Sequence, residues 1–123
     1  MALVELREIL VAYGLGPLFI LLAIPLAFDK VPPNGFYGVR LPSTLDDPEV
    51  WYAVNRKVGR ELATAGATHL LIIGGASLYS LARGRPLTTL SDVSALLAGA
   101  IAVWLFLRSI QVSREFRDSR FKE

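Results

Sequence analysis

The sequence predicts an all-α fold: an integral membrane three-helix bundle with an ordered interfacial loop and a short amphipathic helix between the first and second spans. Two observations lead to this class. Hydrophobic residues make up 53% of the 123 residues and the mean hydropathy is +0.46, above the usual share of a soluble domain, and they gather in three blocks. A polar stretch rich in Pro, Gly, Asn and Arg, residues 32–59, separates the first two blocks. The length suits one domain, residues 1–123.

The three apolar blocks have the lengths of membrane spans. The first, about residues 9–28, contains no charged residue, and the second, residues 62–82, contains no Lys, Arg, Asp or Glu. A helix needs roughly 20 apolar residues to cross about 30 Å of hydrocarbon, so both blocks can span a bilayer. The third block is shorter. We extend it to about residues 90–108, because Asp92 can lie near the headgroups and Arg108 can snorkel to an interface.

Two alternatives place these blocks outside a bilayer. The helices of a soluble all-α protein would carry polar stripes at a 3.6-residue period, whereas these blocks are apolar on all sides. The first block could instead be a cleaved signal peptide. It is longer than the usual apolar region of such a peptide, Glu5 and Glu8 precede it, and no small-residue cleavage site follows it. We therefore expect a multi-pass protein of the cell membrane, with the lipid bilayer as its first partner.

The distribution of Lys and Arg predicts the orientation of the spans. With three spans, the N-terminus and the second loop share one side, and they carry three such residues, namely Arg7, Arg83 and Arg85. The first loop and the C-terminal tail share the other side and carry ten: Lys30, Arg40, Arg56, Lys57, Arg60, Arg108, Arg114, Arg117, Arg120 and Lys122. By the positive-inside rule, the first loop and the C-terminus are cytoplasmic and the N-terminus lies outside. The tail is expected to be a helical extension or a disordered end.

Small residues recur every four positions on two of the predicted spans. They are Gly59, Ala63 and Ala67 in the second span, and Ala95 with Gly99 and Ala98 with Ala102 in the third. Small residues at this spacing let helix backbones approach closely. We expect these faces to pack the three helices together, or to pack one protomer on another as a homo-oligomer; the sequence leaves both open.

His69 is the only histidine, and it falls within the second span. A polar ring within a membrane usually faces the interior of the helix bundle. The chain has no cysteine and no second histidine, so a metal site lacks ligands. Two roles remain for His69: a hydrogen bond between helices, or proton or substrate chemistry.

The first loop, the motif loop of residues 29–61, is predicted to be ordered rather than a flexible linker. Residues 31–33 are Val-Pro-Pro, and proline fixes its own φ and restricts the residue before it, so this backbone is extended. The pair Asn34-Gly35 is a strong turn signal. Gly38 allows a second tight bend or a close backbone approach.

A helix is predicted to begin at Pro48. Asp47 is a good N-cap, proline is favoured at the first helical position, and Glu49 suits the positive end of a helix. This capping role also explains the acidic residues without a metal, and we predict none. The helix is expected to run along the membrane surface as a separate amphipathic element, or to bend near Gly59 into the second span.

The loop and the start of this helix carry a motif that resembles the SdpI family of bacterial membrane proteins. The matching positions are Pro33, Asn34, Gly38, Arg40, Pro42, Thr44, Leu45, Trp51, Asn55 and Gly59. The resemblance implies a short, single-module member, since fuller members carry an additional N-terminal membrane region. The best-known member gives immunity to a secreted toxic peptide and relays the presence of that toxin to a repressor.

The motif supplies the candidate site residues. We predict a binding site formed by Asn34, Gly38, Arg40, Pro42, Thr44, Trp51, Asn55 and His69. The guanidinium of Arg40 suits a carboxylate or a phosphate, and the asparagines both donate and accept. An alternative is that these side chains bond one another and only fix the loop.

Two functions follow from these residues. In the first, the protein is not an enzyme and binds a peptide, a lipid or a partner membrane protein through the loop, with no cofactor, no metal and no nucleic acid. In the second, it is a membrane-embedded enzyme or transporter subunit that uses the same loop together with His69.

Overall fold

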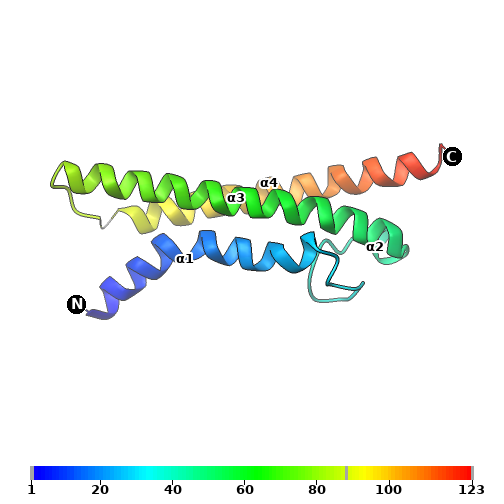
Figure 1. Cartoon of the computed structure of the whole chain (residues 1–123), viewed down its shortest axis with the longest axis horizontal. Coiled ribbons are helices and arrows are strands. Elements are labelled where there is room, and N and C mark those ends of the chain that lie inside the picture. The colour runs from blue at the N-terminus through cyan, green and yellow to red at the C-terminus, as the bar shows by residue number, and fades with distance from the viewer. Residues whose placement is uncertain (1, 88, 123) are drawn as a thin grey trace.

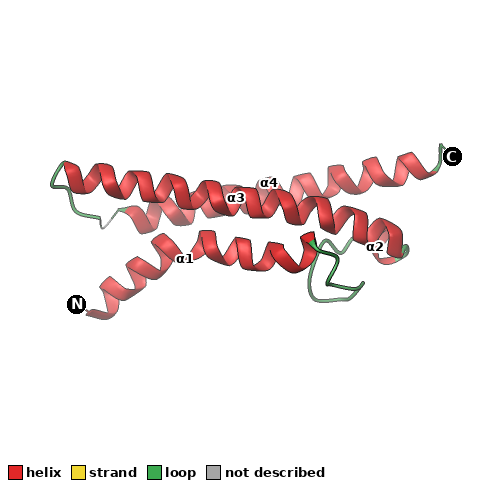
Figure 2. Cartoon of the chain, in the orientation of Figure 1, coloured by secondary structure: helices red, strands yellow, loops and turns green. Residues whose placement is uncertain are grey.

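The computed structural model describes residues 2–87 and 89–122, and it is built from helices joined by loops (Figure 1, Figure 2). The four helices are α1 (Ala2–Ala27), α2 (Pro42–Leu45), α3 (Pro48–Ala82) and α4 (Leu90–Arg120). Three of them, α1, α3 and α4, are long and apolar enough to cross a membrane. The predicted all-α membrane bundle is therefore confirmed.

The three long helices lie side by side, and neighbouring helices in the chain run in opposite directions (Figure 1). The loop between α1 and α3 lies at the same end of the bundle as the C-terminal end of α4, and the N-terminus lies at the other end. The N-terminal part of α1 bends away from α3. Pro17 lies inside α1, and a proline that removes a helix hydrogen bond is a common cause of such a bend.

The helix predicted to begin at Pro48 does begin there. Asp47 is the N-cap, and its side chain accepts a hydrogen bond from the Glu49 backbone N–H at 2.9 Å. The expectation of a separate amphipathic helix before the second span is wrong, because α3 continues without interruption to Ala82. Gly59 does not end a surface helix. Of the alternative, a helix that bends near Gly59 into the second span, the continuity into the span is confirmed.

Glycines bring α1 and α3 into close contact. A Cβ atom on Gly59 would lie 2.8 Å from the backbone nitrogen of Ala27, and one on Gly66 would lie 2.8 Å from the carbonyl oxygen of Gly16. Both distances are too short for a real Cβ, so these two positions must lack a side chain. The predicted small-residue packing at Gly59 is thus within one chain, whereas a Cβ on Gly99 would meet nothing within 4 Å among the described residues.

Helix α4 closes the bundle at both of its ends. Near the N-terminus of the chain, the fully buried hydroxyl of Ser94 donates to the carbonyl oxygens of Val11 and Ala12 on α1, at 2.9 and 3.0 Å. At the opposite end, Val112 is fully buried in a cluster with Val50, Val54 and Val58 of α3. The C-terminal tail was predicted to be either a helical extension or a disordered end. It is a helical extension of the third span, because α4 continues to Arg120.

Candidate functional site

We call residues 29–47, which join α1 to α3, the cap. Its first turn is closed by Asn34. The Oδ1 atom of this side chain accepts hydrogen bonds from the backbone N–H groups of Phe36 and Tyr37, both at 2.8 Å. Its Nδ2 atom donates to the carbonyl oxygens of Pro32 and Tyr37, at 2.8 and 3.1 Å. These four hydrogen bonds of the Asn34 side chain are thus made within the cap itself.

The centre of the cap is held by the first two turns of α3. Asn55, which is 2% exposed, accepts from the Val39 backbone N–H at 2.6 Å and donates to the Trp51 carbonyl at 3.0 Å. The fully buried Trp51 indole donates to the Val31 carbonyl at 2.7 Å. Trp51 therefore anchors the chain that leaves α1 and is not exposed on the surface of the protein.

Gly38 lies where the cap crosses these two side chains. Its φ of +111° is one that L-residues with a side chain rarely adopt. A Cβ atom at this position would lie 2.7 Å from Asn55 Oδ1 and 3.2 Å from the Trp51 ring. Only glycine satisfies both the backbone conformation and the space.

Thr44 and Pro42 shape the end of the cap. Thr44 is fully buried, and its hydroxyl donates to the Val39 carbonyl at 2.7 Å and accepts from the Leu41 N–H at 2.9 Å. Pro42 is the first residue of α2, a position where its missing N–H costs nothing. Like Asn34 and Asn55, Thr44 has its hydrogen bonds inside the protein.

Arg40 is the exception among the predicted site residues. It is exposed, and its guanidinium donates to the Gly35 carbonyl, which engages one of its five N–H groups. Arg40 borders a hollow of about 230 Å³ that separates the cap from α4. We call this space the cap hollow; it is lined by Gly38, Val39, Arg40, Leu41, Phe106, Ser109 and Ile110.

His69 lies apart from the cap. It is fully buried, and its Nε2 atom shares a hydrogen bond with the Ser94 hydroxyl at 3.0 Å, while its Nδ1 atom has no partner among the described residues. The structure thus contains the interhelical hydrogen bond that was one of the two expected roles. The cap hollow does not include His69, and the surface groove that His69 borders does not include Arg40.

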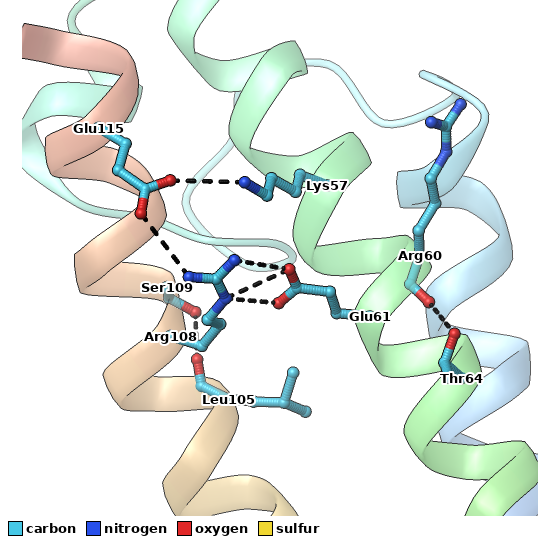
Figure 3. A network of polar contacts seen from close by, with 8 residues as sticks. All are labelled: Lys57, Arg60, Glu61, Thr64, Leu105, Arg108, Ser109 and Glu115. Carbon is cyan, nitrogen blue, oxygen red and sulfur yellow. Dashed lines mark hydrogen bonds and ion pairs between the residues drawn. The ribbon is translucent and has the colours of Figure 1, made fainter.

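A charged cluster that we did not predict from the sequence joins α3 to α4 (Figure 3). Arg108 binds Glu61 through two nitrogens, with distances of 3.0 to 3.2 Å, and lies 3.8 Å from Glu115, which also pairs with Lys57 at 3.4 Å. We call these four residues the ion-pair network. A signal in the sequence could have revealed this pairing. Glu61 directly precedes the second apolar block and Arg108 ends the third, so both charges are expected on the same side of the bilayer.

Further contacts fasten the cap to its surroundings. The Tyr37 hydroxyl donates to the Leu22 carbonyl of α1, and burial raises the pKa of this phenol above its ordinary value. Asp29 accepts from Arg56 on α3 at 2.7 Å, and Asp47 pairs with Arg120 near the end of α4. The cap is therefore tied to all three long helices.

Comparison with known families bears directly on the cap. A profile of the SdpI/YfhL protein family matches residues 30–110, which is more than half of the chain and includes the whole motif. The chain belongs to the SdpI/YfhL family. Comparison with curated proteins and with solved structures gave no match.

SdpI/YfhL membership fits the architecture. The family is an immunity-type family of membrane proteins that is not known for enzymatic activity, and the chain has three helices able to span a bilayer. It is therefore a small integral membrane protein of that family. Within it, Asn34 and Thr44 shape the cap, Trp51 and Asn55 hold it on α3, and the exposed Arg40 carries the charged group of the motif.

Proposed function

We propose that this SdpI/YfhL protein is a binding module that holds a membrane-associated peptide in the cap hollow, with Arg40 pairing to a carboxylate of the peptide. The observation that carries the proposal is the position of Arg40. It is an exposed cation at the rim of a hollow whose far wall, Phe106 and Ile110, is apolar. Such a site suits a ligand with one anionic group and an apolar segment.

The backbone of the cap supports a peptide as the ligand. The backbone of Leu41 is extended, with φ −107° and ψ 157°, and no backbone–backbone hydrogen bond joins Arg40 to any described residue. The backbone N–H and C=O of Arg40 can therefore pair with an extended peptide. Membership in an immunity-type family is a further reason to favour a peptide over a small metabolite.

The other motif residues act in this proposal by holding Arg40 in place. Gly38 and Asn55 fix the backbone on one side of it, and Thr44 fixes the backbone on the other. A preorganised loop binds with less loss of conformational entropy than a mobile one. The distribution of Lys and Arg, ten against three, supports a cytoplasmic cap, so the peptide would be bound at the inner surface of the membrane.

Site-specific photo-crosslinking tests the proposal. A photo-reactive phenylalanine at Ile110, in the cap hollow, is expected to form an adduct of peptide mass in producing cells. The same group at Leu97 serves as the control, because Leu97 borders the surface groove beside His69 and not the cap hollow. It should form no adduct of peptide mass. Arg40→Ala should abolish the Ile110 adduct and Arg114→Ala should not, since Arg114 is exposed and does not border the cap hollow.

Three results would reject peptide binding at the cap hollow. They are an Ile110 adduct that persists in Arg40→Ala, an adduct that contains only lipid, and an adduct with a large membrane protein. Because Arg40 is exposed, its replacement should leave the fold intact, and circular dichroism of the purified variant checks this.

A further inference from the structure

A surface groove runs between α3 and α4 on a different side of α4 from the cap hollow. Its volume is about 430 Å³. We call it the α3–α4 groove; it is lined by Arg60, Glu61, Thr64, Ala65, Thr68, His69, Ile72, Leu97, Ile101 and Trp104. It lies within the apolar part of α3 and α4 and opens on their surface.

The wall of the groove is apolar in spite of its two threonines. The Thr64 hydroxyl donates to the Arg60 carbonyl at 3.0 Å, and the Thr68 hydroxyl donates to the Thr64 carbonyl at 2.9 Å. Both hydroxyls are thus satisfied by the helix backbone. The wall therefore favours hydrocarbon.

The cap end of the groove carries one cation with no anionic partner. Glu61 is held by Arg108, and the whole ion-pair network balances its own charges. Arg60 is exposed and forms no ion pair with any described residue, and its side chain extends away from the network (Figure 3). Because the apolar segment of α3 begins at Leu62, Arg60 lies at the level expected for lipid headgroups.

The length of the groove matches one lipid chain. From Arg60 to Ile72 α3 rises by about 18 Å, close to the roughly 15 Å depth of hydrocarbon in one leaflet. An acyl chain whose phosphate lies at Arg60 can therefore follow the apolar wall along the whole groove. The unpaired charge of Arg60 favours a phospholipid as the occupant, because the lipid phosphate can pair with it.

We infer that the α3–α4 groove holds one acyl chain of a phospholipid whose anionic headgroup is bound by Arg60. The apolar wall receives the chain, and the free guanidinium supplies hydrogen bonds to the phosphate. This site is separate from the cap hollow and does not depend on the function proposed for Arg40.

Native mass spectrometry of the purified full-length protein tests the inference, with phosphatidylglycerol and phosphatidylcholine as the probes. We expect one phosphatidylglycerol to be retained, in preference to phosphatidylcholine. Arg60→Gln should weaken its retention about ten-fold, the loss expected for a charged hydrogen bond, and Arg114→Gln should leave retention unchanged. Thr68→Trp, which fills the exposed groove, should also release the lipid.

Several outcomes would overturn the site. They are equal retention of the two lipids, unchanged retention in Arg60→Gln, unchanged retention in folded Thr68→Trp, and a lipid-free dimer as the main species. A thermal unfolding curve for each variant separates loss of lipid from loss of fold. Arg60→Lys keeps the positive charge, so it should retain more phosphatidylglycerol than Arg60→Gln does. Equal retention by these two variants would show that the charge of Arg60 does not bind the lipid.

Discussion

Replacing Gly38 by alanine should destabilise the cap more than any other single methyl group added to it. The φ of +111° at Gly38 is strained for alanine, at a cost of about 1–3 kcal/mol. The new Cβ would also lie 2.7 Å from Asn55 Oδ1. If that oxygen moves away, it loses the hydrogen bond that it accepts from the Val39 N–H. A buried donor left without a hydrogen bond costs about 1–3 kcal/mol of stability.

These two effects together give a loss of about 3 kcal/mol or more. Gly35→Ala is the matched control, since Gly35 belongs to the same cap and a Cβ there would meet nothing within 4 Å. The assay is reversible unfolding of both variants in a mild detergent and in a Trp104→Phe background, so that the fluorescence reports Trp51 alone, which is fully buried under the native cap. If Gly38→Ala and Gly35→Ala unfold at the same denaturant concentration, then the φ of residue 38 and its distance from Asn55 do not determine the stability of the cap.

Three other substitutions test the packing of the spans, each by unfolding in detergent. Gly66→Ala should lower the stability of the protein by about 1–3 kcal/mol, because the new methyl group overpacks against α1. Gly74→Ala is the control: open space surrounds Gly74, so stability should be unchanged or should rise by up to about 1 kcal/mol from helix propensity. Equal effects of the two substitutions would disprove the close contact of α1 and α3 at Gly66. Ser94→Ala removes the bonds to His69 and to α1 and should cost about 1 kcal/mol, so an unchanged stability would show that these bonds contribute nothing. Arg108→Gln should lower stability at low salt and less so at high salt, because the charges are partly exposed; no dependence on salt would contradict an ion-pair role.

The features that the sequence predicted correctly are those with local causes. The spans follow from the length of the apolar blocks, and the start of α3 follows from Asp47 and Pro48 at adjacent positions. Family membership followed from the motif between Pro33 and Gly59. Each of these depends on residues that are close in the chain or on composition over one helix.

The features that the sequence left open depend on contacts between distant residues. From the sequence alone, Gly59 could mark a bend in the helix or a site of close helix packing. The close approach of α1 to Gly59, which no local pattern predicts, shows that it is a packing site. Whether Asn55 binds a ligand or the cap depends on Val39, sixteen residues earlier. The pairing of Glu61 with Arg108 links two spans whose relative rotation no local pattern gives.

The central claim is that three helices cross the membrane with the cap and the C-terminus on its cytoplasmic side. The chain has no cysteine, so single cysteines can be introduced at the exposed positions Phe36, Thr89 and Phe121 and treated with a membrane-impermeant maleimide in intact cells. We predict that Thr89→Cys is labelled at once and that Phe36→Cys and Phe121→Cys are labelled only after the membrane is permeabilised. Labelling of Phe36→Cys and Thr89→Cys from the same side would contradict it.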